Sequence, residues 1–450
     1  MQSKSFNLNI NIPIKPFKKT ITVDSDKSLS IRSFLIGAIS HNISKANNVL
    51  ESEDVYSTIN CLKKLGVKII KEKSKSYLIY GKGLGSLFAK KNLNLNFGNS
   101  GTLARLLIGI LSTTPDIEIK IQGDHSLNKR NMQKIIDLMS RFGAEFFPKK
   151  KINFPLKLIS TEMPIGIKYK SGVSAQLKSA VILAGLNSYG KTEIIEDQQS
   201  RDHSENLLAA NTQAIKTKKL TGKKKIIQIF GKKYLNPLHI NIPGDPSSAA
   251  FFTALALLNK ESKLLIKNVG LNKTRIGFYE LLKKHGAKIK FKNIKKNNNE
   301  IYGDIYVESS KIRPIKASKI YYVKSTDEYP ILFVIAALTK GISIFRGIED
   351  LANKESDRVK EMQKILKQAG IKSSVSKNQI KIYGKNFIKN ENKKINVPNL
   401  GDHRICMSAQ VLSLITGIQT SISNFETVYT SAPSFLKIIK YLGGRFEIKK

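Results

Sequence analysis

Hydrophobic residues recur along the chain in one order. An apolar helical stretch ends at a glycine, and an alternating apolar and polar segment follows. A glycine at that position is typical of a left-handed helix cap, and the period of two that follows is typical of a strand. Five clear copies are centred on Gly66, Gly143, Gly286, Gly370 and Gly443. A degenerate copy lies near residues 207–215.

The spacing of these joints predicts a repeated architecture. Gly66 and Gly143 are 77 positions apart, Gly370 and Gly443 are 73 apart, and the other intervals are similar. Helix–glycine–strand joints also occur in α/β proteins that have no repeats, but even spacing favours six βαβ-like units of about 75 residues each. A turn-rich stretch at 241–247 divides the chain into two sets of three units, and it leads into a predicted helix at Ser248–Leu258.

Length and charge narrow the possible classes of protein. A chain of 450 residues is long enough for two domains. The net charge of +42 is typical of nucleic-acid binding, but the lysines are spread along the whole chain rather than gathered in one region. The stretches 292–300 and 389–396 are rich in Asn and Lys, and we expect them to be surface loops.

Cysteine content and hydropathy exclude other classes. The two cysteines, Cys61 and Cys406, lie far apart on predicted helices, which favours a reducing, cytoplasmic location without disulfides. Apolar runs such as Ile331–Leu338 are too short to span a bilayer, and the first twenty residues lack the pattern of a secretory signal. The six histidines form no cluster with metal-ligand spacing, so we expect no bound metal.

Arginine is scarce and therefore informative. The chain has 65 Lys and only 11 Arg, and arginine alone grips a carboxylate or phosphate edge with two parallel hydrogen bonds. Six arginines lie within polar motifs: Arg32, Arg105, Arg130, Arg201, Arg358 and Arg404.

Polar motifs of the first half suit anion binding. Asp26–Ser33, Phe97–Arg105 and Ser174–Ser179 each place hydroxyl, amide or cationic groups at the start of a predicted helix. A helix start offers unpaired N–H groups and the positive end of a dipole. Gly123–Arg130 and Ser200–Ser204 add cations beside turns. Each motif alone also fits an ordinary capped surface helix.

Polar motifs of the second half add acids. Asp327 precedes an apolar helix, where a base can be held. Lys354 and Arg358 are four positions apart, which predicts one helical face with Glu355 beside them. Gly401–Arg404 opens a further predicted helix.

Taken in order from Lys27 to Ser431, these motifs resemble the enolpyruvyl transferase family, and within it the branch that uses shikimate 3-phosphate. Several of them have the form sometimes called class II. The specific pieces are Asp-Lys-Ser-x-Ser-x-Arg, Gly-Asn-x-Gly-Thr, Gly-Asp-x-Ser-Leu-x-Lys-Arg, Ser-Ala-Gln-x-Lys-Ser, Ser-Arg-Asp-His, Pro-Gly-Asp-Pro-Ser-Ser-Ala, Lys-Glu-Ser-Asp-Arg and Asp-His-Arg.

The resemblance implies a fold. It is a two-lobed, inside-out α/β barrel built from six βαβαββ repeats. One lobe would comprise residues 1–22 and 243–450 with three repeats, and the inserted lobe would comprise residues 23–242 with the other three.

The resemblance also implies a reaction, in which the enolpyruvyl group of phosphoenolpyruvate passes to the 5-hydroxyl of shikimate 3-phosphate. The implied catalytic residues are Asp327, Glu355, Lys27 and Lys354. The implied shikimate 3-phosphate ligands are Lys27, Ser28, Arg32, Ser174, Ala175, Gln176, Arg201, Asp327 and Lys354. The implied phosphoenolpyruvate ligands are Lys27, Asn99, Gly101, Arg130, Gln176, Arg358 and Arg404.

The implied enzyme is a cytoplasmic monomer whose partners are these two small molecules. It uses no cofactor or metal and contacts neither nucleic acid nor membrane. The chain departs from the family pattern at Asn131, Ala352, Asn353 and Ala432, and none of these replaces a catalytic group.

Three further interpretations remain open on the residues alone. A UDP-N-acetylglucosamine enolpyruvyl transferase shares the fold and the donor, but it typically carries a cysteine within the segment that corresponds to 112–135, where this chain has none. A basic RNA-binding protein is the second. A scaffold without catalysis on the same fold is a third possibility, against which the complete set of acids and cations argues.

Overall fold

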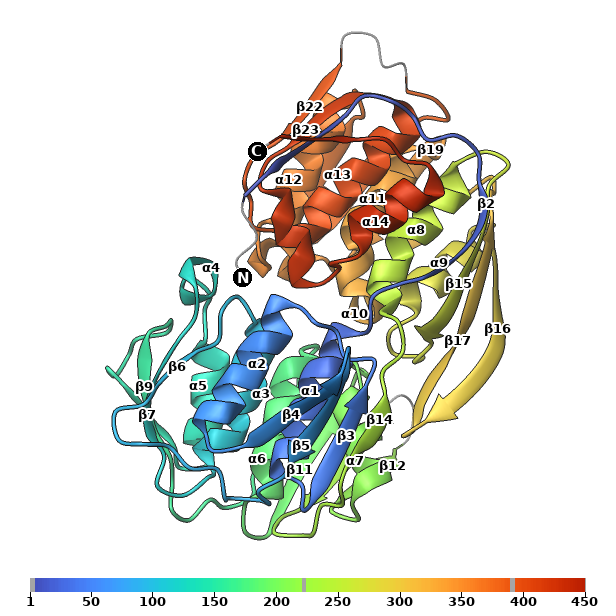
Figure 1. Ribbon diagram of the computed structural model, residues 1–450. Helices are drawn as coiled ribbons and strands as arrows, with labels where there is room; N and C mark the ends of the chain where they lie inside the picture. Colours follow the sequence, from blue (N-terminus) through green and yellow to red (C-terminus); the bar gives the residue numbers. More distant parts are fainter. Residues whose placement is uncertain (1–4, 221–223, 389–392, 450) are drawn as a thin grey trace. The chain divides into compact units, whose positions relative to one another are not determined.

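The computed structural model describes residues 5–220, 224–388 and 393–449. The chain divides into two compact units (Figure 1). The terminal unit comprises Met1–Asp24, Pro243–Lys295 and Ile301–Lys450, and the inserted unit comprises Ser25–Ile242 and Lys296–Glu300. Each unit is described by itself below.

Six four-stranded sheets make up the β-structure, three in each unit. The inserted unit has the orders β14-β3-β5-β4, β6-β7-β9-β8 and β10-β11-β13-β12. The terminal unit has β22-β23-β1-β24, β16-β17-β15-β2 and β18-β19-β21-β20. In the inserted unit each sheet joins one parallel pair to antiparallel neighbours, which is the pairing that a βαβ crossover followed by a hairpin produces. The mixed α/β architecture predicted from the periodicity is confirmed.

The strands of the inserted unit are β3 (Ile43–Asn47), β4 (Lys68–Lys73), β5 (Ser76–Tyr80), β6 (Asn94–Asn96), β7 (Glu118–Gln122), β8 (Glu145–Phe147), β9 (Leu156–Ile159), β10 (Lys168–Ser171), β11 (Lys191–Glu196), β12 (Ile215–Lys219), β13 (Lys225–Phe230) and β14 (His239–Asn241). Those of the terminal unit are β1 (Asn7–Ile10), β2 (Lys18–Thr22), β15 (Lys263–Gly270), β16 (Lys288–Asn297), β17 (Glu300–Glu308), β18 (Lys316–Ala317), β19 (Gly341–Arg346), β20 (Ser373–Ser376), β21 (Gln379–Gly384), β22 (Lys394–Val397), β23 (Gln419–Ile422) and β24 (Glu447–Lys449).

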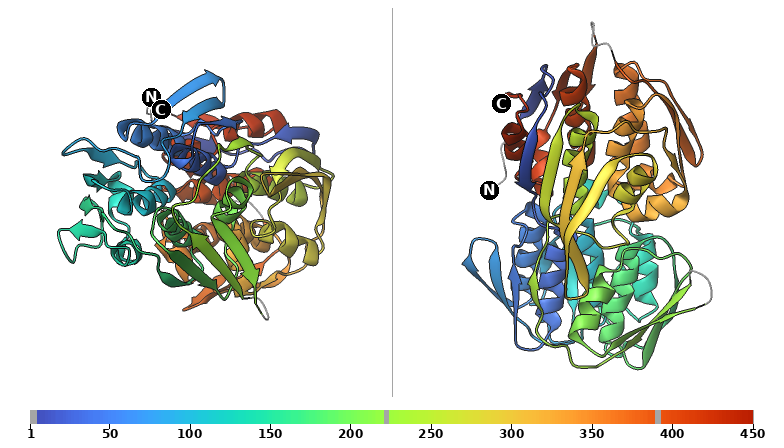
Figure 2. Two further views of the ribbon diagram at one scale, coloured as in Figure 1. Left: turned by 90° about the horizontal axis from the view of Figure 1, so that it is seen from below. Right: turned by 90° about the vertical axis from the view of Figure 1, so that its right-hand side faces the viewer.

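Inner helices form the centre of each unit (Figure 2). Nearly all of their side chains are buried. These helices lack a polar face because other elements cover every side of them, as expected for helices enclosed by a core. In the inserted unit they are α1 (Lys27–Ile39), α3 (Gly101–Ser112) and α6 (Ala175–Leu186). In the terminal unit they are α8 (Pro246–Leu258), α11 (Tyr329–Ala337) and α13 (His403–Thr416).

Outer helices are amphipathic and bury one stripe each, because their other face meets solvent. They include α2 (Glu53–Lys64), α5 (Gln133–Ser140), α9 (Gly277–Lys284), α12 (Arg358–Gln368) and α14 (Phe435–Leu442), each followed by one of the repeated glycines. The remaining helical segments are α4 (His125–Asn128), α7 (His203–Asn211), α10 (Lys319–Ser325), η1 (Thr326–Glu328), η2 (Glu349–Asn353) and η3 (Phe425–Thr430).

The glycines of the repeated joints adopt the predicted conformation. Gly66, Gly143, Gly286, Gly370 and Gly443 have φ between 76° and 103°. A side chain at such a φ is strained, whereas glycine adopts it readily. The five predicted left-handed caps are therefore confirmed.

Apart from Lys296–Glu300, which groups with the inserted unit, the chain passes between the units twice, each time between a strand and an inner helix. β2 precedes α1 in the sequence, but it pairs in parallel with β15 of the terminal unit. β14 precedes α8, but it pairs in parallel with β3 of the inserted unit. Each strand thus occupies in its own unit the place at which a repeat begins, and an aspartate caps the helix after each passage: Asp26 for α1 and Asp245 for α8.

Two sequence-based expectations about loops need correction. The stretch 292–300 is not a loop, because β16 runs to Asn297 and the adjacent β17 begins at Glu300. Only the turn between these strands matches the Asn-rich signal, since Asn298 and Asn299 adopt positive φ values of 46° and 61°, which asparagine tolerates. Of the stretch 389–396, residues 389–392 lie outside the described ranges and Lys394 already begins β22.

The predicted helix at Ser248–Leu258 and the predicted helical position of both cysteines agree more closely with the structure. Helix α8 begins at Pro246, two residues before its predicted start, because Asp245 accepts a hydrogen bond from the Ser247 amide and proline suits the first turn. Both cysteines are free and buried in helices, and burial raises the pKa of the Cys61 thiol to about 12. No helix of the described segments is long and apolar enough to cross a membrane.

Helices α3 and α6 approach each other closely at Gly109. A Cβ added there would lie 2.6 Å from the carbonyl oxygen of Ala180. We expect Gly109→Ala to lower the free energy of unfolding by about 1–3 kcal/mol, because the backbone of α6 cannot retreat within a packed core. Urea denaturation measures this loss. The control is Gly172→Ala, where an added Cβ meets no atom within 4 Å, and a similar loss there would contradict the explanation.

Candidate active site

In the inserted unit, the predicted residues at the start of α1 lie on a capped first turn. Asp26 accepts a hydrogen bond of 2.8 Å from the Leu29 amide, which begins the helix at Lys27. The Lys27 ammonium lies 3.0 Å from Asp54 Oδ2, and its side chain keeps 19% of its surface exposed. Lys27 is therefore oriented by α2 and still accessible.

Arg32 ties three segments of the inserted unit together. Its Nε donates to Ser204 Oγ at 2.9 Å, and its Nη2 donates to Ser179 Oγ at 3.1 Å. Its Nη1 donates to the Ser28 carbonyl oxygen at 3.1 Å. The side chain is almost completely buried. Arg32 therefore holds the start of α1 against α6 and α7.

The glycine-rich turn before α3 is joined to the start of α6. The hydroxyl oxygens of Ser100 and Ser174 cap α3 and α6, because they accept hydrogen bonds from the amides of Leu103 and Leu177. Arg105 Nη1 donates to Gln176 Oε1 at 2.8 Å. The two predicted motifs, which are far apart in the sequence, thus meet side by side.

Arg105 is a site residue that the sequence-based set omitted. Besides Gln176, its Nη1 reaches the Gly101 carbonyl oxygen at 3.1 Å, one helical turn before it. Gln176 is fixed a second time, because its Nε2 donates to Thr102 Oγ1 at 3.0 Å. The signal in the sequence was the i, i+4 spacing of Gly101 and Arg105, which places the guanidinium over the helix start.

The other predicted cations of this unit lie on turns. Arg130 Nη2 donates to Asn99 Oδ1 at 2.7 Å, so that the turn after α4 contacts the turn before α3. Asn131 is one of the positions that depart from the motif pattern. It stabilises the backbone of its own turn, because its Oδ1 accepts a hydrogen bond of 2.8 Å from the Gln133 amide. Arg201 is half-buried in the turn before α7.

In the terminal unit, Arg358 is the centre of a group of acids. Its Nε lies 2.9 Å from Asp402 Oδ2, and its Nη2 lies 2.5 Å from Glu355 Oε2. Its Nη1 lies 3.7 Å from Asp327 Oδ1. Burial alone would lower the pKa of Arg358, but the three carboxylates outweigh burial and raise it. The structure thus brings together the predicted Asp327, Glu355 and Arg358 around a permanent cation.

The predicted helical face of Lys354 and Arg358 is wrong. Lys354 follows η2 with an extended backbone at φ −90° and ψ −153°, and α12 begins only at Arg358. The helix cannot extend further toward the N-terminus because Asp357 caps it, accepting from the Lys360 amide at 3.0 Å. Lys354 and Glu355 therefore lie in the loop before the helix.

Lys354 nevertheless has an unusual environment. Burial lowers the pKa of its ammonium group, and the nearby Asp327 carboxylate opposes this effect only in part. A larger share of its amine is neutral than for an exposed lysine at the same pH. That property suits a group that exchanges protons.

Arg404 lies at the start of α13, and two nitrogens of its guanidinium group are not paired with other described residues. Its amide donates to Asp402 Oδ1 at 3.0 Å, and its guanidinium lies over the Phe251 ring at 5.8 Å. The side chain is buried, and its Nε and Nη1 have no hydrogen-bond partner among the described residues. Leaving buried donors of a charged group without partners is costly, so the arrangement favours an anionic ligand at this position.

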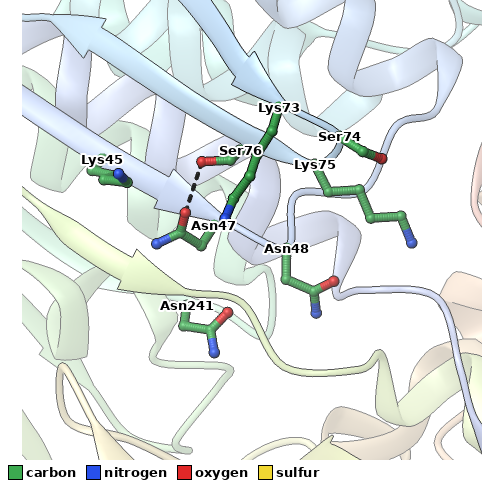
Figure 3. A pocket seen from close by; sticks show the side chains of 8 residues that line it. All are labelled: Lys45, Asn47, Asn48, Lys73, Ser74, Lys75, Ser76 and Asn241. Carbon is green, nitrogen blue, oxygen red and sulfur yellow. Dashed lines mark hydrogen bonds between the residues drawn. The ribbon is translucent and has the colours of Figure 1, made fainter.

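A cavity of about 560 Å³ lies elsewhere in the inserted unit, at the ends of β3, β5 and β14 (Figure 3). Only lysine, asparagine and serine side chains line it, among them Asn47, which accepts a hydrogen bond of 2.8 Å from Ser76. No predicted site residue faces this cavity, and its lining offers no carboxylate. Across the described part of the chain, no three His, Cys, Asp or Glu side chains gather as metal ligands.

Comparisons with known proteins match nearly the whole chain to one family. The family model described as EPSP synthase (3-phosphoshikimate 1-carboxyvinyltransferase) matches residues 12–439. The 3-phosphoshikimate 1-carboxyvinyltransferase of Zymomonas mobilis is 36% identical over 436 residues, which cover 96% of each chain. The structure of EPSP synthase from Acinetobacter baumannii matches with a TM-score of 0.85 at 33% identity, over 99% of this chain and 100% of that one.

The fold extends beyond close relatives. The crystal structure of the enolpyruvyl transferase NikO from Streptomyces tendae matches with a TM-score of 0.76, over 99% of each chain. At 12% identity this likeness concerns the fold alone. It supports the enolpyruvyl transferase-like fold that the sequence motifs implied.

Asp402 supports Arg358 and α13 together, so we expect its replacement to destabilise the terminal unit. Asp402→Asn keeps a capping oxygen but removes the carboxylate from a fully buried ion pair, which costs about 3 kcal/mol. Urea denaturation followed by circular dichroism measures the loss. Asp357→Asn is the matched control, because it replaces the cap of α12 by a residue that caps about as well and leaves the ion pairs of Arg358 in place. It should cost less than about 0.5 kcal/mol. Equal losses would contradict the role of the ion pair.

Proposed function

This chain belongs to the EPSP synthase family, and from that premise we propose which of its side chains bind and convert the substrates. The reaction transfers the enolpyruvyl group of phosphoenolpyruvate to the 5-hydroxyl of shikimate 3-phosphate, which gives 5-enolpyruvylshikimate 3-phosphate and phosphate. Of the two transferases open on the sequence alone, the comparisons favour the one that uses shikimate 3-phosphate.

Shikimate 3-phosphate binds mainly to the inserted unit in this proposal. Lys27, Ser28 and the start of α6 supply ammonium, hydroxyl and backbone N–H groups for the phosphate, as helix starts do for anions. Arg201 adds a cation from the turn before α7. Arg32 makes three internal hydrogen bonds and therefore acts largely by holding Ser28 and α6 in place. In the terminal unit, Asp327 and Lys354 bind the ring hydroxyls.

Phosphoenolpyruvate binds to the remaining cations. Arg404 supports this part of the proposal, because its buried Nε and Nη1 have no hydrogen-bond partner in the described segments. Arg358 and Arg130 add charge, and Asn99 and Gly101 form the turn that orients Arg130. Gln176, which two hydrogen bonds hold in place, contacts both substrates.

Proton transfers complete the proposed mechanism. Asp327 takes the proton of the 5-hydroxyl as its oxygen bonds to the central carbon of phosphoenolpyruvate. Glu355, together with Lys27 or Lys354, delivers a proton to the methylene carbon, so that a methyl group forms. The tetrahedral adduct then loses phosphate and a methyl proton and restores the double bond. General acid–base catalysis of this kind contributes about 10²–10⁴-fold.

The same proposal covers the setting of the enzyme. We expect the enzyme to be a monomer. We also expect it to act in a reducing cytoplasm, an expectation that its two buried free cysteines support. The substrates themselves carry the chemistry, and the cations of the site stabilise their charges, so the proposal assigns no role to a cofactor or metal.

Phosphate release tests the proposal directly. With phosphoenolpyruvate alone the enzyme should release no phosphate, and with shikimate 3-phosphate added it should release one equivalent per turnover. We expect Asp327→Ala and Lys27→Ala to lower kcat at least about 10²-fold, because each removes a group that acts on the reacting atoms. The control is Lys45→Ala, which lines the cavity that no predicted site residue lines. Near-full activity of Asp327→Ala would refute the assigned base.

Gly101 offers a more selective test. A Cβ there would lie 2.9 Å from Arg105 Nη1 and 3.1 Å from Arg130 Nη1, so both guanidinium groups must shift. We expect Gly101→Ala to raise KM for phosphoenolpyruvate about tenfold or more, because misplaced donors lose binding energy steeply. KM for shikimate 3-phosphate should change much less. Steady-state kinetics with each substrate varied in turn distinguishes the two, and a selective rise for shikimate 3-phosphate would contradict the assignment.

A further inference from the structure

Four charged residues form a cluster inside the inserted unit that the proposed mechanism does not use. Lys178 is completely buried, and its Nζ lies 2.7 Å from Glu196 Oε1 and 2.7 Å from Glu205 Oε1. Lys225 Nζ lies 3.9 Å from the same oxygen of Glu205. We call Lys178, Glu196, Glu205 and Lys225 the buried charge set.

The buried charge set joins four elements. Lys178 belongs to α6, Glu196 ends β11, Glu205 lies in the first turn of α7, and Lys225 begins β13. Glu196 Oε1 also accepts from the amide and the hydroxyl of Ser200, at 2.9 and 2.8 Å. One oxygen atom thus fixes both the end of α6 that carries Lys178 and the turn that leads to α7.

Three members of the set lie next to, or are hydrogen-bonded to, a segment of the proposed shikimate 3-phosphate site: Lys178, Glu205 and, through Ser200, Glu196. Lys178 lies one turn after Ser174 and directly before Ser179. Ser200 directly precedes Arg201, and Glu205 directly follows Ser204. The hydroxyls of Ser179 and Ser204 are 2.8 Å apart, and both accept hydrogen bonds from Arg32.

The charges of the set cancel. Two lysines face two glutamates, so the set adds no net attraction for a phosphate group when all four are ionised. Burial lowers the pKa of Lys178, but the carboxylates of Glu205 and Glu196 outweigh burial and raise it, which keeps Lys178 charged. Buried ion pairs contribute little net stability compared with apolar packing, and their best-attested role is to fix one arrangement of the elements they join.

We infer that the buried charge set positions the shikimate 3-phosphate site, by locking the start of α6 and the Ser200–Ser204 turn in register with Arg32. Its members are positioning residues that do not touch the substrate. This inference rests on the proposed function, because it takes the ligands of shikimate 3-phosphate from it.

Binding of shikimate 3-phosphate without phosphoenolpyruvate tests the inference. Glu205→Gln and Glu196→Gln keep the shape of each side chain and an oxygen acceptor, but each leaves the set with a net positive charge. We expect the dissociation constant for shikimate 3-phosphate, measured by titration calorimetry, to rise about tenfold or more. Losses of this size are found at metal sites when a residue that orients a metal ligand is replaced. KM for phosphoenolpyruvate at saturating shikimate 3-phosphate should rise less than this dissociation constant, since Gln176 is shared by both sites but Arg358 and Arg404 are intact.

A stability control separates positioning from general damage. Ile194→Ala opens a cavity in β11 two residues before Glu196, so it should lower the unfolding temperature without weakening shikimate 3-phosphate binding. If a glutamine variant fails to fold, the other one and Lys178→Arg, which keeps the charge but changes the geometry, still measure the effect. Unchanged binding in a folded variant of the set, or an equal loss of binding in Ile194→Ala, would overturn the inference.

Two further variants distinguish this failure from failure of the proposed site. Lys27→Ala and Arg201→Ala remove proposed ligands directly. If neither weakens shikimate 3-phosphate binding, the proposed site is wrong. If both weaken it while the glutamine variants bind normally, the site stands and the positioning role of the buried charge set is refuted.

Discussion

The burial of the inner helices is the constraint on which the rest of the structure depends. A helix that is enclosed on every side can present polar groups only at its ends, where its first backbone N–H groups lack partners. Five of the six inner helices satisfy part of this need with a side-chain cap. The capping residues are Asp26, Ser100, Ser174, Asp245 and Asp402.

The same helix starts carry the candidate site. Lys27, Gly101, Gln176 and Arg404 all lie within the first turns of inner helices, and Asp327 lies just before another. The positive end of a helix dipole and the unpaired N–H groups favour an anion without any net charge on the domain. The proposed binding of anions therefore does not depend on the large excess of lysine in this chain.

The two arginines of the terminal unit illustrate how neighbours divide the work. Arg358 is surrounded by carboxylates and contributes a fixed charge that orients Asp327 and Glu355. Arg404 lies over the Phe251 ring, and its Nε and Nη1 have no hydrogen-bond partner within the described ranges. The family resemblance assigned both to phosphoenolpyruvate. Their difference arises from Asp402, whose carboxylate is paired with one guanidinium and with the backbone of the other.

Features of local origin were predictable from the sequence. The glycine caps and the starts of α1, α3, α6 and α13 follow from a few adjacent residues, and the structure agrees with them. The predicted face of Lys354 and Arg358 failed because spacing says nothing about where a helix begins, and the Asp357 cap begins it at Arg358. The pairing of Arg105 with Gln176, 71 positions away, and the cluster around Lys178 depend on tertiary packing, which no single segment encodes. The residues assigned to each substrate stay predictions.

The order of strands has a consequence for how the protein is made. Apart from Lys296–Glu300, the inserted unit is one continuous segment, so its sheets can pair as soon as residue 242 leaves the ribosome. β1, in contrast, pairs with β23 and β24, which follow it by more than 400 positions. A nascent chain can thus form the sheets of the inserted unit while β1 still lacks its partners, and the sheet that contains β1 forms only after β23 and β24 have been synthesised.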